Sequence, residues 1–287
     1  MTRARGIVCA ALLAACGGGG DDDGGAIDAR AGVDGEGAID GAGADAAPAV
    51  AETEPNNGTS AEDVNTVTFP GGVRGAIDPA DDTDVFASEL AVGTRWTFRV
   101  EAAAAFAPHL IVTNHADEAP VTLALGGAGE AIALEQVILA GGRHNFIVRD
   151  ARNVPDATGV GGATHTYTLR ATPLERAPTT AAIPSTPTGT LASPFAVALY
   201  QFNLATETDV RIDVQARRLA SASDLDTRAS LVRLADQAHL ITNDDLDGAQ
   251  LDSRVEGVLA AGDYLLVIDN VDPAATDLRF AVDFALR

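Results

Sequence analysis

Carboxylates are the most abundant side chains in this chain that could take part in chemistry, and one group of them is closely spaced. The 287 residues include 41 Asp and Glu against 19 Lys and Arg, which gives a net charge of −22. Asp244, Asp245 and Asp247 fall together in the run NDDLDG. Carboxylate oxygens suit hard cations such as Ca²⁺, so the run could form an ion-binding loop. A type I turn with solvated acids explains the same residues, and both interpretations stay open.

The residue types that most often act as nucleophiles and bases show no catalytic spacing. The motifs HExxH and GxSxG are absent, and neither Ser230 nor Ser253 has the local context of an acyl-transfer nucleophile. The five histidines lie in separate segments of the sequence, at His109, His115, His144, His165 and His239. We therefore expect a protein without catalysis of its own, and the alternative is a hydrolase with a cryptic site.

The amino terminus carries the pattern of an export signal followed by a lipid-attachment site. Arg3 and Arg5 precede the apolar run Gly6 to Ala15, which is too short to span a bilayer. The run ends in Leu-Ala-Ala before Cys16, which resembles the bacterial lipoprotein box and implies cleavage after residue 15 and lipidation of Cys16. Several acyl chains anchor a soluble protein durably. An ordinary signal peptide with an incidental cysteine is the alternative.

The sequence after Cys16 predicts a disordered tether up to residue 50. Residues 17–50 hold eight acids, one Arg and no aromatic residue, and Gly, Asp and Ala dominate. Such a segment cannot bury enough apolar surface to offset its ordering entropy. No other apolar run reaches the length of a membrane span, so the lipid is the expected membrane contact. The acidic charge argues against binding nucleic acid.

The remainder of the chain has the pattern of antiparallel β-strands. Apolar and polar residues alternate in short runs that are separated by Gly, Pro and Asp, which is typical of half-buried strands. Examples are Trp96–Val100, Tyr167–Leu169, Val210–Val214 and Phe280–Phe284. Denser apolar runs at Leu110–Val112 and Tyr264–Ile268 suit central strands. The pattern predicts an all-β protein, with the aromatic residues of these runs facing the core.

The β pattern occurs twice, at an offset of about 116–120 residues, which suggests duplicated domains. Gly71–Gly75 parallels Thr188–Leu191, His109–Val112 parallels Ser230–Arg233, and Ile138–Gly142 parallels Val258–Gly262. Four prolines lie between the copies, and proline at that density gives a semi-extended linker. We predict a first sandwich over residues 51–172, a linker over 173–188 and a second sandwich over 189–287.

Several motifs in order resemble the bacterial pre-peptidase C-terminal (PPC) domain. In the first copy they are Glu52–Asn57 (ETEPNN), Gly75–Asp78 (GAID) and Asp82–Phe86 (DTDVF). The second copy carries the later half of the pattern in Asn243–Asp245, Asp252–Arg254 and Leu259–Val267. The resemblance implies tandem jelly-roll-like antiparallel β-sandwiches, which are accessory modules without catalysis.

The same resemblance implies one calcium site, in the first copy. Its ligands would come from Glu52, Glu54, Asn56, Asn57, Asp81 or Asp82, and Asp84. These side chains can supply the six to eight hard oxygens that calcium takes. The alternative is a turn at residues 55–58 and a solvated hairpin tip before the strand. The second copy has Ala198 at the position of the last Asp and no ExEPN motif before it.

Together these features predict a lipid-anchored protein of the bacterial cell envelope with two binding or adhesion modules. The outer membrane is the expected location, on either its periplasmic or its surface face. The partner would be a protein, a glycan or a matrix, and calcium is the expected cofactor. A purely structural surface spacer is the alternative to a binding function.

Overall fold

The structure is a computed structural model that describes residues 49–57, 64–114, 122–153, 159–246 and 250–287. The predicted signal peptide, Cys16 and nearly all of the predicted tether lie outside these residues, as does Asp247. Within the described ranges, no helix has the length and apolarity needed to cross a membrane.

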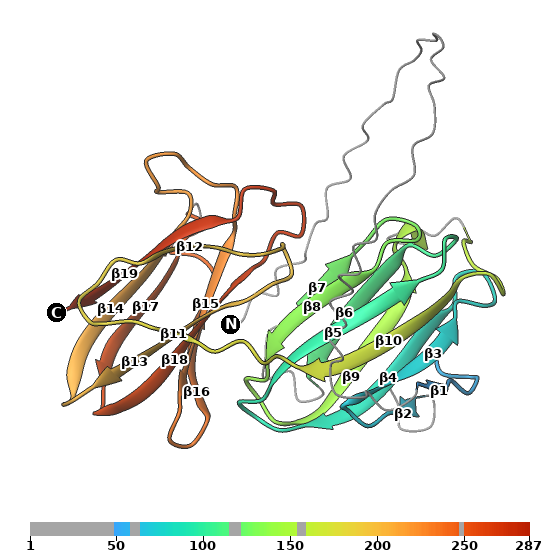
Figure 1. The fold of residues 1–287 in the computed structure, drawn as a ribbon, viewed down its shortest axis with the longest axis horizontal. Helices are drawn as coiled ribbons and strands as arrows, with labels where there is room; N and C mark the ends of the chain where they lie inside the picture. Colours follow the sequence, from blue (N-terminus) through green and yellow to red (C-terminus); the bar gives the residue numbers. More distant parts are fainter. Residues whose placement is uncertain (1–48, 58–63, 115–121, 154–158, 247–249) are drawn as a thin grey trace, which may run out of the picture. The chain divides into compact units, whose positions relative to one another are not determined.

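The described residues form two β-sandwiches (Figure 1), which confirms the predicted all-β class. The first sandwich consists of sheets A and B. Sheet A has the order β1 (Val50–Ala51), β3 (Gly71–Ala76), β10 (Thr166–Pro173), β5 (Arg95–Ala102) and β8 (Ile132–Val137). Sheet B has the order β2 (Asn65–Thr66), β4 (Thr83–Leu90), β9 (Gly142–Asp150), β6 (Pro108–Asn114) and β7 (Thr122–Leu125). A 3₁₀ turn, η1 (Ala151–Asn153), follows β9.

The second sandwich consists of sheets C and D. Sheet C has the order β11 (Thr179–Thr180), β13 (Ala198–Leu204), β18 (Gly262–Asn270), β15 (Thr227–Arg233) and β16 (Ala238–Asn243). Sheet D has the order β12 (Thr188–Thr190), β19 (Arg279–Leu286), β14 (Thr208–Gln215) and β17 (Ser253–Leu259). Neighbouring strands are antiparallel, except that the short edge strands β1, β2 and β11 pair in parallel.

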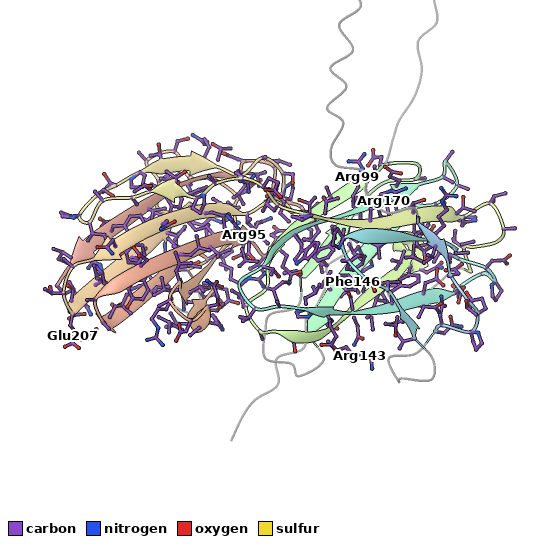
Figure 2. All side chains as sticks on the ribbon, turned by 60° about the horizontal axis from the view of Figure 1, so that its bottom comes forward. Arg95, Arg99, Arg143, Phe146, Arg170 and Glu207 are labelled. Atoms are coloured by element: carbon purple, nitrogen blue, oxygen red, sulfur yellow. The ribbon has the colours of Figure 1, made fainter. Side chains whose placement is uncertain are left out.

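Alternation along the strands places the apolar residues between the sheets. In β5, Trp96, Phe98 and Val100 are buried, whereas Arg99 and Glu101 between and beyond them point outward. Phe146 of β9, labelled in Figure 2, contacts Phe98 with a ring-centroid distance of 4.9 Å. In the second sandwich Phe202 stacks on Tyr264 at 5.4 Å. The predicted inward orientation of the aromatic residues is therefore confirmed.

The strand register shows which positions of the two sandwiches correspond. Leu90 pairs with Gly142 in sheet B, and Leu204 pairs with Gly262 in sheet C. Counting back from these pairs, Asp84 opposite Val148 corresponds to Ala198 opposite Ile268. In the other sheets, Tyr167 opposite Gly75 corresponds to Phe280 opposite Gly189.

Two of the sequence parallels between the copies had the wrong register. Gly189 corresponds to Gly75, because each lies opposite the equivalent aromatic residue of the next strand. Val112 corresponds to Leu231, because Phe146 and Leu266 are their partners in β9 and β18. The second error arose because short apolar runs repeat every two residues, so a shift of two residues preserves the pattern. The first arose because a five-residue run was set beside a four-residue run, which fixes no register.

The segment predicted as a linker contributes strands to the second sandwich. β10 ends at Pro173, and β11 then pairs with β13. Ser185 forms an isolated bridge with Phe284, and β12 begins at Thr188. Part of the proline-rich segment thus belongs to the edges of sheets C and D.

Candidate metal centre

Two segments direct oxygen-bearing side chains toward one another at the edge of the first sandwich. Glu52, Glu54 and Asn56 follow β1 at intervals of two residues, with a bend at Glu54 and a cis bond between Glu54 and Pro55. Asp82 and Asp84 show the same spacing at the start of β4. Backbone hydrogen bonds hold the first segment in place, from the Glu52 N–H to the Arg74 carbonyl (2.9 Å) and from the Val85 N–H to the Asn56 carbonyl (2.8 Å).

Three carboxylates converge between these segments. Glu52, Glu54 and Asp84 each place one oxygen so that all three oxygens lie within 4.8 Å of one another. Asp84 is fully buried, Glu52 is half-buried and Glu54 is exposed. The group therefore extends from the interior of the sandwich to its surface, where an ion can enter.

Asn56 adds a fourth oxygen-bearing side chain to this group. Its side chain is fully buried, and its Nδ2 donates to Glu52 Oε2 at 3.4 Å. Its backbone N–H donates to Glu54 Oε2 at 3.2 Å. These contacts place the amide of Asn56 among the carboxylates.

Two buried oxygens of this group lack a hydrogen-bond partner among the described residues. They are Oδ1 of Asn56 and Oδ1 of Asp84. Buried polar atoms are nearly always satisfied, and leaving one unsatisfied costs about 1–3 kcal/mol. Because both are hard oxygen acceptors beside other carboxylates, a cation is the natural partner for them.

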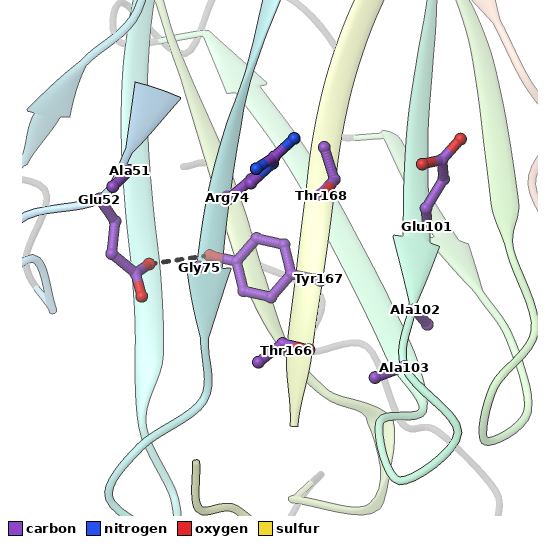
Figure 3. Close-up of a pocket in the computed structure, with 10 residues that line it drawn as sticks. All are labelled: Ala51, Glu52, Arg74, Gly75, Glu101, Ala102, Ala103, Thr166, Tyr167 and Thr168. Atoms are coloured by element: carbon purple, nitrogen blue, oxygen red, sulfur yellow. Dashed lines mark hydrogen bonds between the residues drawn. The ribbon is translucent and has the colours of Figure 1, made fainter. Parts of the chain in front are cut away.

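Tyr167 of β10 and Gly75 of β3 complete the inner wall of the group. The Tyr167 hydroxyl lies 2.5 Å from Asp84 Oδ2 and 3.3 Å from Glu52 Oε2, the contact drawn in Figure 3. A Cβ atom at Gly75 would lie 2.1 Å from Glu52 Oε2 and 2.4 Å from the Tyr167 hydroxyl oxygen. Only glycine therefore lets these two side chains meet over β3.

Burial raises the pKa of each carboxyl in the group, and neighbouring carboxylates add to the rise at Asp84 and Glu54. Burial raises the pKa of Asp84 to about 8, against the hydrogen bond from Tyr167, and Glu52 adds to the rise. Burial also raises the pKa of Glu52 and of Glu54. A divalent cation would stabilise the charged forms, because an opposite charge at short range lowers a carboxyl pKa.

The other residues predicted for this site lie around it. Asp82 is buried, and its two oxygens accept the N–H groups of Thr83 (2.9 Å) and Asp78 (3.3 Å). Asp81 is exposed with a φ of 69°, and its carboxylate lies beside Gly159. Asn57 is also exposed. The structure thus brings Glu52, Glu54, Asp84 and Asn56 together, with Asp82 beside them and Asp81 turned away.

The acidic run of the second sandwich has a different arrangement. Asp244 is exposed and Asp245 is half-buried. They face Asp226, whose pKa is raised to about 6 by burial and then by Asp245. Within the described residues, the group around Glu52 is the one in which three possible metal ligands converge, and it contains no histidine.

Tyr167 and Gly75 are the site residues that sequence reasoning missed. The alternation around Tyr167 predicts that it faces the core, which is correct for its ring but gives no indication of its hydroxyl contacts. Gly75 belongs to a motif that gives it no structural role. Both residues belong to strands that are distant from Glu52 in the sequence, so local patterns do not reveal their contacts with the site.

Comparisons with known proteins gave matches among solved structures alone. No protein-family model matches the chain, and the search of curated proteins gave no match. Among solved structures, the pre-peptidase C-terminal domain of collagenase from Bacillus anthracis is similar at 15% identity and a TM-score of 0.31, over 40% of this chain and 100% of that one.

Two other solved structures are also similar. The CUB1-EGF-CUB2 domain of human MASP-1/3 has 9% identity and a TM-score of 0.22, over 75% of this chain and 99% of that one. The M60 catalytic domain with the CBM51-1 and CBM51-2 domains from Clostridium perfringens ZmpB has 10% identity and a TM-score of 0.24, over 75% and 34%. The assignment of the site therefore rests on its own geometry.

Proposed function

We propose that this protein is a lipid-anchored, non-catalytic binding module of the bacterial cell envelope, with a structural calcium ion in its first sandwich. The anchor would be Cys16, and the ion would be held by Glu52, Glu54, Asp84 and Asn56. The ordered resemblance to PPC domains supports the class of module. The observation that carries the calcium proposal is the pair of buried, unpartnered oxygens on Asn56 and Asp84 beside two further carboxylates.

The ion would act as a clamp between the two sheets. Glu52 follows β1 of sheet A, whereas Asp84 belongs to β4 of sheet B, so one cation would join both layers. It would also fix the segment through which the chain enters the sandwich from the anchor side. Calcium suits this role because it accepts carboxylate and amide oxygens in flexible geometry.

Calcium-dependent stability tests the proposed clamp. Calcium at about 100 times its dissociation constant should stabilise the folded chain by about 2.7 kcal/mol relative to chelator. The melting temperature of the wild type should therefore rise by several degrees, and that of Asp84→Asn should not. Equal melting temperatures of the wild type with calcium and with chelator would reject the clamp.

Lipid labelling tests the proposed anchor independently. Cells that express the full chain should incorporate radiolabelled palmitate into it, and Cys16→Ser should abolish the label. Cys9→Ser is the matched control, because Cys9 lies within the predicted signal peptide and should not affect labelling. Label that persists in Cys16→Ser would show that the anchor assignment is wrong.

A further inference from the structure

The outward face of sheet A carries an arginine group whose charge the described residues do not neutralise. Arg74, Thr168 and Glu101 lie in one row across β3, β10 and β5, because Thr168 pairs with both of the others. The next row contains Arg170, directly opposite Arg99. Figure 2 shows Arg99 and Arg170 on the same face of the first sandwich. Like charges placed directly opposite in a sheet are destabilising.

The acidic partners available to this group are few. Arg99 has one ion pair, with Glu101 at 3.5 Å, and both side chains are about half exposed (52% and 53%), so the pair is weak. Arg74 and Arg170 have no ion-pair partner among the described residues. In a chain with a net charge of −22, this face therefore holds three cations beside a single acid.

On the corresponding face of the second sandwich, neighbouring arginines neutralise a pair of like charges. Asp213 there lies directly opposite Asp283, at the positions that correspond to Arg99 and Arg170. Three arginines of the same sandwich pair with Asp213, namely Arg211 at 3.0 Å, Arg254 at 2.7 Å and Arg218 at 3.5 Å. The second sandwich supplies its own counter-charges, whereas around Arg99 and Arg170 the described residues supply Glu101 alone.

An open cavity lies beside the arginine group. It has a volume of about 570 Å³, and its lining includes Arg74, Glu101 and Thr168, which project the same way in Figure 3. Glu52 and Tyr167 of the metal centre also line it. Ala102 and Ala103 give it an apolar wall. This volume falls within the range of small-molecule sites, which combine an apolar lining with a few polar groups.

We propose that this face binds an acidic glycan, with a sugar acid in the cavity. The Arg74 guanidinium would pair with the sugar carboxylate, since its planar fork matches a carboxylate. The Glu101 carboxylate and the Thr168 hydroxyl would take sugar hydroxyls. Arg99 and Arg170 would hold the next negative charge along the glycan. An acidic peptide fits less well, because it offers Glu101 further carboxylates and few hydroxyls.

This assignment rests on the proposed binding function, because it names the ligand class of the first module. Its proposed contacts are outward-facing side chains, and Glu52, a ligand of the proposed ion, lines the same cavity. Its test is calorimetric titration of the full chain with tetragalacturonate. Maltotetraose is the neutral control, and tetra-aspartate is the acidic-peptide control.

The expected result is saturable binding of tetragalacturonate that weakens with added salt, together with no binding of maltotetraose. The double variant Arg74→Gln/Arg170→Gln should lower the affinity by about tenfold or more, since it removes charged hydrogen bonds. Arg233→Gln is the matched control, because it removes an exposed arginine of the second sandwich and should leave the affinity unchanged.

Three results would overturn the assignment. They are no binding of tetragalacturonate, an equal affinity in the double variant, and binding of tetra-aspartate as tight as that of tetragalacturonate. The last would identify the partner as an acidic peptide. If calcium still raises the melting temperature while tetragalacturonate fails to bind, the glycan assignment alone is wrong and the calcium clamp stands.

Discussion

The first and second sandwiches share their strand order, yet they differ at the position where the first gathers its carboxylates. Asp84 of the first corresponds to Ala198 of the second, and Tyr167 corresponds to Phe280. Strand β1 has no counterpart among the described residues of the second sandwich, whose sheet D has four strands. The second sandwich is therefore a natural control, in which the same scaffold folds without a carboxylate at the position of Asp84.

The shared scaffold also explains which features belong to folding alone. Gly75 and Gly189 both lie under an aromatic ring, Tyr167 in one case and Phe280 in the other. A glycine at this position is thus needed for packing in both sandwiches. The hydroxyl of Tyr167 and the carboxyl of Asp84 are the additions that distinguish the first.

The largest expected effect comes from filling the space above these glycines. A Cβ at Gly189 would lie 2.5 Å from the ring of Phe280, and one at Gly75 would meet Glu52 and Tyr167 at similar distances. Gly75→Ala and Gly189→Ala should each destabilise the chain by about 3 kcal/mol or more, the upper end of the usual cost of overpacking, because these contacts are so short. Urea unfolding measures both.

The two glycine variants should differ in their response to calcium. Gly75→Ala should abolish stabilisation by calcium because it displaces Glu52, whereas Gly189→Ala should retain it. A calcium response that survives in Gly75→Ala would mean that Glu52 is not a ligand, and the contrast between the sandwiches would lose its basis.

Acid should weaken the first sandwich through His109. Burial, and then the neighbouring Arg149, lower the pKa of His109 to about 4. The folded chain binds this proton less readily than the unfolded chain, so the stabilisation present above pH 6.5 is lost as pH falls toward 4. The loss can reach about 3 kcal/mol. The corresponding pair of the second sandwich, Arg228 and Asp269, is an ion pair at 2.8 Å.

The contribution of His109 is isolated by comparing the wild type with His109→Leu. The Asp84 carboxyl, with its pKa raised to about 8, acts with the opposite sign in chelator, because its stabilisation grows as pH falls. Urea unfolding between pH 7 and pH 4 should show a smaller acid-induced loss in His109→Leu. Parallel pH profiles for the two proteins would contradict the buried, neutral histidine.

A moderate effect on stability is expected when Asp84 and Tyr167 are replaced by the residue types that the second sandwich has at these positions. In chelator, Asp84→Ala leaves the Tyr167 hydroxyl without its nearer acceptor, and an unsatisfied buried group costs about 1–3 kcal/mol. Adding Tyr167→Phe removes that group, so the double variant should be more stable than Asp84→Ala by about 1–2 kcal/mol. Chemical denaturation in chelator measures the difference. A double variant less stable than the single one would show that the hydroxyl has another role.

The smallest expected effect concerns the outward faces. Arg170→Gln should stabilise the chain by about 0.2–0.5 kcal/mol, because it relieves the repulsion with Arg99. Asp283→Asn is the matched change in the second sandwich and should bring no gain, since arginines already surround Asp213. Thermal unfolding at low salt compares the two. A stabilisation by Asp283→Asn as large as that by Arg170→Gln would remove the contrast between the outward faces of the two sandwiches.

The sequence predicts the strands better than it predicts the site. Alternation identified β5, β10, β14 and β19, because one face of each strand must pack in the core. The motif that follows β1 identified Glu52, Glu54 and Asn56 through its resemblance to the PPC pattern. The strand predictions depend only on local periodicity.

What the sequence could not predict depends on contacts between distant strands. Tyr167 reaches Asp84 across 83 residues, and no local pattern connects them. Asp81 and Asp82 were equivalent as ligands in the sequence, but the positive φ of Asp81 turns its carboxylate away. The parallel pairing of β1 with β3 also depends on how the chain enters sheet A.

We propose that the first sandwich binds one calcium ion and that the second binds none. The most direct measurement is calorimetric titration of the full chain with calcium, compared with Asp84→Asn and with Asp226→Asn in the acidic group of the second sandwich. We predict one ion per chain in the wild type and in Asp226→Asn, and none in Asp84→Asn. One ion bound by Asp84→Asn, or none by the wild type, would contradict the claim.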